Sequence, residues 1–373
     1  MGVRQGAVEG LVVDPEFWRN RSVLITGHSG FKGSWLALWL HHMAARVTGM
    51  SLEPPSSPNL FELARVAEVV DSIHGDVREL EALSNVCSKA RPEIIFHLAA
   101  QSLVRESYRD PATTFATNTL GTVNCLEAAR HTDTVRAVVI VTTDKCYRNS
   151  GRTQGYRETD ELGGTDPYAA SKACAELVTE AYRRSFFSSP ERRSLVASVR
   201  AGNVIGGGDW AAERLVPDAM RAFSSGTPLR LRNPTSTRPW QHVLDPLLGY
   251  LMLGEQLLRG IESAARAWNF GPDLKDAKPV EWVADELAAR WGDGVRWVTD
   301  KGAELKEAEV LALDSSQARR DLHWAPRLSL ADALDWVVDW YRGHLKGNNP
   351  RAQTLSQIQK YMSLAGKLAS GLP

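Results

Sequence analysis

Tyr168 and Lys172 are the residues of this chain whose types and spacing most clearly suggest chemistry. Side chains four residues apart share one face of a helix. There a lysine ammonium can lower the pKa of a phenol, so that the phenolate accepts a proton from a substrate hydroxyl. Such a base suits the oxidation of an alcohol by a nicotinamide cofactor. The spacing alone is weak evidence, because the same two residues often share a helix face that only meets solvent.

Two polar segments follow apolar runs and are candidates for the same site. Thr142-Thr143-Asp144-Lys145 ends the run 137–142, and Gln101, Ser102 and Arg105 follow the run 94–100. Ligands of open parallel sheets bind beyond the carboxyl ends of the strands. These segments must therefore be placed by the strands that precede them.

Apolar runs of strand length alternate with helical stretches, notably 112–129, along the first 200 residues. Runs of this kind are typical of parallel strands that are buried on both faces. The alternation predicts an α/β fold, a Rossmann-like doubly wound parallel sheet. The predicted strands are 22–26, 47–52, 73–77, 94–100, 137–142 and 195–200.

The alternation becomes less regular after Arg200, which predicts a smaller α+β substrate-binding lobe. The tail is polar and has one candidate amphipathic helix, 355–364. The predicted dinucleotide-binding domain comprises residues 17–203 with about 238–270. The predicted substrate lobe comprises 204–237 with about 271–345, and the tail with a short helix comprises 346–373.

A glycine loop, Gly27-x-x-Gly30-x-x-Gly33, lies between a predicted strand and a predicted helix, which is the context of a dinucleotide site. The first glycine permits the turn, the second lets the backbone approach a pyrophosphate, and the third allows close helix packing. The helix that begins at Phe31 would turn free N–H groups toward the phosphates. Lys32 either adds charge near the pyrophosphate or points to solvent.

The choice between NAD and NADP depends on the residues after the second and third strands. Glu53 is the nearest acidic residue that could bind the adenine ribose hydroxyls. The sequence has no arginine cluster here that could bind a 2′-phosphate, and both observations favour NAD. Asp76 and Val77 could hold the adenine edge.

Composition excludes several classes of protein. The 373 residues carry no formal net charge, which gives no sign of nucleic-acid binding. No apolar run approaches the ~18 residues of a membrane helix, and no signal peptide is evident. The four cysteines are scattered, which predicts buried thiols in a reducing cytoplasm and no metal site.

Several longer motifs share one order with a known family. The glycine loop, His97-Leu98-Ala99-Ala100-Gln101, Asn118, Thr142-Thr143-Asp144 and Tyr168-x-x-x-Lys172 resemble the extended short-chain dehydrogenases/reductases. Within them the chain resembles the nucleotide-sugar 4,6-dehydratases, and the CDP-glucose branch in particular. Further motifs carry that likeness over roughly residues 17–365: Thr26 to Trp35, Asp144-Lys145-Cys146-Tyr147, Asn203 to Trp210 and Arg238 to Val243.

The resemblance implies a reaction that consumes no cofactor. Tyr168 would deprotonate the glucosyl 4-hydroxyl, assisted by Thr143 and Lys172, while a tightly bound NAD takes a hydride from C4 and later returns it to C6. Asp144 would protonate the leaving 6-hydroxyl. Lys145 would be the C5 base or a cation that stabilises the C4 enolate. CDP-D-glucose would become CDP-4-dehydro-6-deoxy-D-glucose and water, in deoxysugar synthesis of the O-antigen or lipopolysaccharide type.

The same resemblance implies binding residues and an assembly. Cofactor contacts would come from Leu98, Ala99, Asn118 and Thr142, besides the glycine loop, Asp76, Val77, Tyr168 and Lys172. Substrate contacts would come from Gln101, Ser102, Arg105, Thr143, Asn203, Leu215 and Arg238. A homodimer or a higher homo-oligomer would form through helices of the dinucleotide-binding domain.

Two other functions remain open from the sequence. A nucleotide-sugar 4-epimerase on the same fold would share Thr143, Tyr168 and Lys172 but would not require Asp144 and Lys145. A non-enzymatic NAD(P)-sensing protein could dispense with Tyr168 and Lys172, so the presence of both argues against it.

Overall fold

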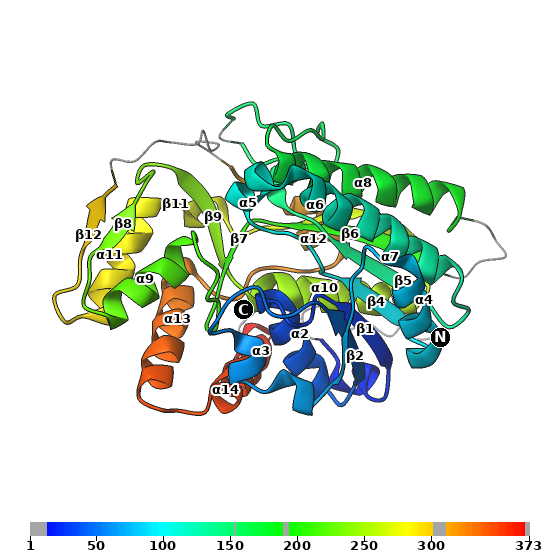
Figure 1. Ribbon diagram of the computed structural model, residues 1–373, viewed down its shortest axis with the longest axis horizontal. Coiled ribbons are helices and arrows are strands. Elements are labelled where there is room, and N and C mark those ends of the chain that lie inside the picture. The colour runs from blue at the N-terminus through cyan, green and yellow to red at the C-terminus, as the bar shows by residue number, and fades with distance from the viewer. Residues whose placement is uncertain (1–12, 153, 189–193, 301–310, 370–373) are drawn as a thin grey trace, which may run out of the picture.

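Seven parallel strands form the central sheet of the protein, in the order β10-β6-β5-β4-β1-β2-β3 (Figure 1). The structure is a computed structural model that describes residues 13–152, 154–188, 194–300 and 311–369. The strand order reverses between β1 and β4, which is where open α/β sheets bind ligands. The strands are β1 (Ser22–Thr26), β2 (Arg46–Ser51), β3 (Asp71–His74), β4 (Ile94–His97), β5 (Ala137–Val141), β6 (Leu195–Ala201) and β10 (Ala267–Phe270).

Both faces of this sheet are buried, as the apolar runs predict. Within β1, Val23 and Ile25 belong to one hydrophobic cluster and Leu24 to another on the opposite face. Successive side chains of a strand point to opposite faces, so continuous apolar runs fit a sheet covered by helices on both sides. The predicted bounds of β1 agree with the structure. β3 ends at His74, which leaves Asp76 and Val77 in the following loop.

Helices pack against each face of the sheet (Figure 1). α7 (Gly121–Arg130) packs between α4 (Leu80–Ala90) and α8 (Pro167–Ser185), and α2 (Phe31–His42) contacts α10 (Leu244–Leu258). The helix predicted at 112–129 is continuous over α6 (Pro111–Phe115), a π-helical turn η2 (Ala116–Leu120) and α7. The smaller elements around the sheet are α1 (Pro15–Trp18), α3 (Leu60–Leu63), η1 (Val66–Glu68), α5 (Val104–Arg109), η3 (Asp144–Cys146), η4 (Glu262–Ala264), η5 (Leu274–Asp276) and α12 (Ser316–Asp321).

A second group of elements forms two small sheets beside the carboxyl ends of the central strands. One sheet has the order β11-β9-β7 and the other pairs β12 with β8. Their elements are β7 (Asn203–Ile205), β8 (Leu229–Leu231), β9 (Thr237–His242), β11 (Ala277–Pro279), β12 (Trp297–Thr299), α9 (Leu215–Ser224), α11 (Val280–Trp291) and α13 (Leu330–Leu345). The domain division predicted above stays a prediction, and residues 301–310 and 370–373 lie outside the described residues.

The C-terminal helix is longer than the sequence predicts. α14 spans Pro350–Ala369, whereas the pattern predicts 355–364. Its buried residues Ile358 and Tyr361 explain why it continues: the Tyr361 ring lies 5.7 Å from that of Trp39, edge to face, and its hydroxyl donates to Oδ1 of Asp245 at 2.6 Å. The helix therefore packs against α2 and α10.

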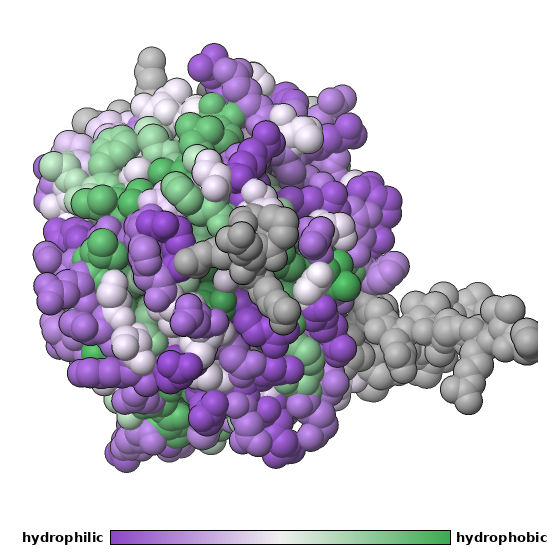
Figure 2. All heavy atoms as spheres, turned by 90° about the vertical axis from the view of Figure 1, so that its right-hand side faces the viewer, coloured by the Kyte–Doolittle hydropathy of each residue, from purple (hydrophilic) through white to green (hydrophobic). Residues whose placement is uncertain are grey.

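Hydrophilic residues cover most of the face shown in Figure 2, and hydrophobic areas gather in its upper part. Among the residues that the structure describes, no helix combines the length and the apolar character that crossing a membrane requires.

Candidate active site

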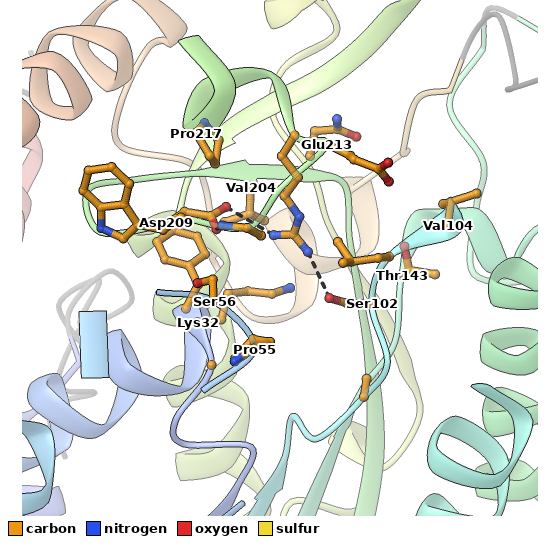
Figure 3. A pocket seen from close by; sticks show the side chains of 18 of the residues that line it. Lys32, Pro55, Ser56, Ser102, Val104, Thr143, Val204, Asp209, Glu213 and Pro217 are labelled. Carbon is orange, nitrogen blue, oxygen red and sulfur yellow. Dashed lines mark hydrogen bonds and ion pairs between the residues drawn. The ribbon is translucent and has the colours of Figure 1, made fainter. Parts of the chain in front are cut away.

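A large cavity lies where the carboxyl ends of the central strands meet the two small sheets. The glycine loop, the ends of β4 and β5 and the first turns of α8 line one side. β7, the start of α9 and the segment from β8 to β9 line the other. Figure 3 shows side chains from both sides, among them Lys32, Ser102 and Asp209, facing the same space. The reacting groups predicted from sequence are thereby brought together.

The glycine loop has the geometry of a phosphate-binding turn. Gly27 has a φ of +77°, and a Cβ there would lie 2.7 Å from the backbone nitrogen of Ala99. A Cβ on Gly33 would lie 2.1 Å from the carbonyl oxygen of Gly27, so larger residues fit neither position. No side chain caps α2 at Gly30, which leaves its first N–H groups to a ligand. These features fit the pyrophosphate of a dinucleotide.

The acidic residues predicted to meet the adenosine lie along the cavity, each with a partner. Asp76 accepts hydrogen bonds from the backbone nitrogen and the guanidinium of Arg78, at 2.9, 2.8 and 2.5 Å. The hydrogen bonds with Arg78 hold the pKa of Asp76 below its ordinary value. Val77 is buried beside it, and Glu53 pairs with His74 at 3.3 Å. Both carboxylates line the cavity, and their predicted contacts with the adenosine stay predictions.

Tyr168 and Lys172 occupy the first turns of α8, as their spacing predicts. The helix is capped by Asp166, whose side chain accepts from the backbone nitrogen of Ala169. Burial raises the pKa of Tyr168 to about 12, while a hydrogen bond with Thr143 acts to lower it. Burial, and then the charge of Lys32, lower the pKa of Lys172 to about 7. Nζ of Lys172 donates to the carbonyl oxygen of Val141 at 3.0 Å, which ties α8 to the end of β5.

Thr143, Asp144 and Lys145 follow β5 and place a carboxyl and an amine beside Tyr168. Oγ1 of Thr143 donates to Oδ1 of Asp144 at 3.0 Å, and Nζ of Lys145 lies 3.4 Å from the same oxygen. The Asp144 side chain is 1% exposed and that of Lys145 29%. Oδ2 of Asp144 is buried with no hydrogen-bond partner among the described residues, and a Cβ on Gly202 would lie 3.1 Å from it.

Lys32 lines the cavity within a group of charges, and its predicted place near the pyrophosphate stays a prediction. Burial and the charge of Arg214 lower its pKa to about 8, Asp144 raises it, and Lys145 adds a smaller lowering. Its ammonium therefore lies near the reacting groups and not in bulk solvent. The excess of cations here suits anionic ligands.

Arg214 is the main cavity residue that the sequence analysis missed. Its guanidinium lies 3.2 Å from Oδ2 of Asp209 and donates to Oγ of Ser102 at 3.0 Å, drawn as dashed lines in Figure 3. The neighbouring Glu213 approaches Arg105 and Arg109, at 3.8 Å each. These contacts join the loop after β4 to the segment before α9. The contacts with Ser102, Arg105 and Arg109 bridge residues more than a hundred positions apart in the chain, which no local pattern could reveal.

Most residues predicted for the site line this one cavity. They are Gly27, Gly30, Phe31, Lys32, Gly33, Asp76, Val77, Leu98, Ala99, Ser102, Arg105, Thr142, Thr143, Lys145, Tyr168, Lys172, Asn203, Leu215 and Arg238. Asp144 lies directly behind them. The direct ligand contacts assigned to each of these residues stay predictions.

Asn118 and Gln101 lie behind the cavity wall and join segments of the chain. Asn118 lies in the π-helical turn η2, where its amide accepts from the backbone nitrogen of Gln101 and donates to Oγ of Ser171, both at 2.9 Å. Nε2 of Gln101 donates to Oγ1 of Thr114 at 2.9 Å. Both residues hold the loop after β4 against α8, and their predicted contacts with cofactor and substrate stay predictions.

The charged side chains of this site do not form a metal centre. Within the described ranges, no group of three or more histidine, cysteine, aspartate or glutamate residues could hold a metal ion. The arrangement is instead that of acid–base chemistry on an organic ligand, with a phenol, a carboxyl and amines around one space.

Known proteins share this fold and sequence. A family model described as GDP-mannose 4,6 dehydratase matches residues 24–336. The chain is 45% identical over 355 residues to the CDP-glucose 4,6-dehydratase of Salmonella typhimurium, which covers 94% of this chain and 99% of that protein. These matches confirm the resemblance to the 4,6-dehydratases found in the sequence.

Solved structures agree on the fold. The UDP-glucose 4-epimerase of Thermotoga maritima, solved with UDP-glucose, has a TM-score of 0.75 at 23% identity, covering 87% of this chain and 99% of that one. The protein MoeE5 in complex with UDP-glucose and NAD has a TM-score of 0.72 at 26% identity, with the same coverage. The Rossmann-like prediction is confirmed. Because the family match spans most of the chain and includes the glycine loop, β5 and α8, the protein belongs to the GDP-mannose 4,6 dehydratase family.

Proposed function

We propose that the protein is an NAD-dependent CDP-glucose 4,6-dehydratase, a hydro-lyase that forms CDP-4-dehydro-6-deoxy-D-glucose and water. The observation that carries the proposal is the cavity lined by Lys145, Tyr168 and Lys172, with the buried carboxylate of Asp144 3.4 Å from Nζ of Lys145. The identity of 45% to the Salmonella enzyme supports the nucleotide and the sugar. Deoxysugar biosynthesis is the setting that this product implies.

The oxidising half of the reaction falls to Tyr168, Thr143 and Lys172. When bound, NAD would accept a hydride from C4 and return it at C6, so that it is regenerated in each turnover and retained tightly. Tyr168 is the base for the 4-hydroxyl. Thr143 forms a hydrogen bond with the Tyr168 phenol and would orient the 4-hydroxyl beside it. Burial opposes the phenolate, and the nearby charge of Arg214 favours it. Thr143 and Arg214 therefore act against the effect of burial on the pKa of Tyr168.

The eliminating half falls to Asp144 and Lys145. Two neighbouring groups that share a proton can exist as an ion pair or as a neutral carboxyl and a neutral amine. The second form provides one acid and one base. In that form Asp144 protonates the departing 6-hydroxyl and Lys145 removes the C5 proton that the 4-ketone acidifies. One proton shared across 3.4 Å supplies both an acid and a base.

Residues on the other side of the cavity would recognise the nucleotide. Leu215 and Pro217, at the start of α9, lie along it with Arg238 of β9, whose guanidinium can bind diphosphate oxygens. We place the cytosine against the segment that begins α9, as the family resemblance implies.

The direct test is incubation with CDP-, UDP-, dTDP- and GDP-glucose, with products weighed by mass spectrometry. Loss of one water from CDP-glucose in preference to the others is expected. An unchanged mass with inverted C4 would indicate the 4-epimerase, which has no use for the Asp144–Lys145 pair. No reaction with any of the four would refute the proposal.

We also propose a cytoplasmic homodimer. Leu120 at the end of η2 is 48% exposed, Leu177 on α8 is 58% exposed, and Phe115, five positions before Leu120, is 37% exposed. Exposed apolar residues on adjacent packed helices are typical of an interface. The four free cysteines suit a reducing compartment. Light scattering of the purified protein should give twice the chain mass, and Leu177→Glu should lower it to that of a monomer.

A further inference from the structure

A buried ion pair, Glu176 with Arg200, lies behind the site and takes no part in the chemistry described so far. Nη2 of Arg200 lies 2.8 Å from Oε2 of Glu176, and both side chains are 3% exposed. Such a pair is costly to bury and is weak evidence for stability, because apolar residues of similar size often serve as well. Its presence therefore calls for another explanation.

Glu176 belongs to the same face of α8 as the reacting residues. It follows Lys172 by four positions and Tyr168 by eight, so the three side chains lie along one stripe of the helix. Its carboxylate also accepts hydrogen bonds from Oγ1 of Thr142 at 2.5 Å and from Oγ of Ser198 at 2.7 Å. The helix that carries Tyr168 is thereby joined to the residue before Thr143.

Arg200 holds the other end of the same segment. Its Nη1 donates to the hydroxyl of Tyr147 at 2.6 Å, and that hydroxyl donates to Oδ1 of Asn269 at 2.8 Å. Tyr147 directly follows η3, the single turn that contains Asp144 and Lys145. The ion pair thus fixes η3 at both ends, through Thr142 before it and Tyr147 after it.

We propose, on the basis of the function proposed above, that Glu176 and Arg200 are positioning residues that set η3 against α8. Their loss would harm elimination more than oxidation. Tyr168 and Lys172 stay in place on an intact helix, whereas Asp144 and Lys145 depend on the two attachments of η3. Displacement of reacting groups by a fraction of an ångström is enough to lower a rate strongly.

The test removes the attachments one at a time and leaves the charges paired. Thr142→Val and Tyr147→Phe each delete one hydroxyl that connects η3 to the pair. Ser198→Ala is the matched control, because it deletes a hydroxyl bound to the same carboxylate from β6, away from η3. Tyr147 does not line the cavity, so its variant leaves every cavity side chain intact.

Amide hydrogen exchange of the protein without ligands is the first readout. Thr142→Val and Tyr147→Phe should speed exchange in residues 142–148 by about tenfold, the equivalent of one hydrogen bond to a charged network. Exchange in residues 168–176 should stay unchanged, and Ser198→Ala should alter neither segment. Equal exchange in all three variants and the wild type would overturn the proposal, as would an equal effect of Ser198→Ala.

The second readout separates the two halves of the reaction. In a single turnover with CDP-glucose, Thr142→Val and Tyr147→Phe should slow loss of water by about tenfold more than they slow the appearance of reduced-cofactor absorbance. Equal slowing of both steps would overturn the positioning role. If the wild type dehydrates no nucleotide sugar, the proposed function fails, and the exchange experiment still decides whether the pair positions η3.

Discussion

Lys145 and Asp144 are adjacent in the chain, and Nζ of Lys145 lies 3.4 Å from Oδ1 of Asp144 while the other carboxylate oxygen has no partner among the described residues. In such a pair, a protonated carboxyl can donate a proton while the neutral amine accepts a different one. Neighbours in a single 3-10 turn thereby supply the two groups that elimination requires.

The role of Lys145 as a base predicts the same loss of activity for two different substitutions. Lys145→Arg keeps the charge but cannot be deprotonated, so it should lose activity as fully as Lys145→Met, by about 10²–10⁴-fold. The measurement is the rate of water loss from CDP-glucose. Substantial activity in Lys145→Arg, with none in Lys145→Met, would instead show that a cation is sufficient there.

Tyr168→Phe should abolish oxidation, and elimination with it, because the 4-hydroxyl loses its base. A fall of about 10²–10⁴-fold is expected. Tyr250→Phe is a matched control: Tyr250 is buried, and its hydroxyl has no hydrogen-bond partner among the described residues. Turnover of both variants with CDP-glucose checks this. A similar loss in the two variants would mean that the core, and not the base, had been damaged.

Lys172 should give the folding free energy a distinct dependence on pH. Its pKa is about 7 in the folded protein and 10.5 in its ordinary state. Between these values the unfolded chain binds more protons, so the contribution of Lys172 to the free energy of unfolding rises with pH. Lys172→Met lacks this term. Urea unfolding at pH 7 and pH 9.5 should therefore show a smaller gain for the variant than for the wild type, and equal gains would contradict the depressed pKa.

Arg214 should govern the pH at which the enzyme works. Its charge acts to lower the pKa of Tyr168, so Arg214→Met should raise that pKa and shift the rising limb of the rate profile to higher pH. Arg259→Met, which removes an exposed arginine paired with Glu255, is the control. An unchanged pH–rate profile in Arg214→Met would show that Arg214 does not influence the pKa of Tyr168.

Local patterns were enough to predict the elements that carry the chemistry. Apolar runs predict the strands that precede the glycine loop and Thr143, and a helical spacing predicts the shared face of Tyr168 and Lys172 on α8. Arg214 was missed because its partner Ser102 lies 112 positions before it in the chain and meets it only through folding. The same holds for the pairing of Glu176 with Arg200, which joins a helix to a strand 24 residues away. The extent of α14 was underestimated because the core that receives Tyr361 is formed by α2 and α10.

The central claim is that one hydrogen leaves C4 and returns at C6 of the same sugar, with loss of water between. CDP-glucose that carries deuterium at C4 tests it directly. The account predicts a product lighter by one water, with the deuterium at C6. A product of unchanged mass, or one that has lost water but carries no deuterium at C6, would contradict it.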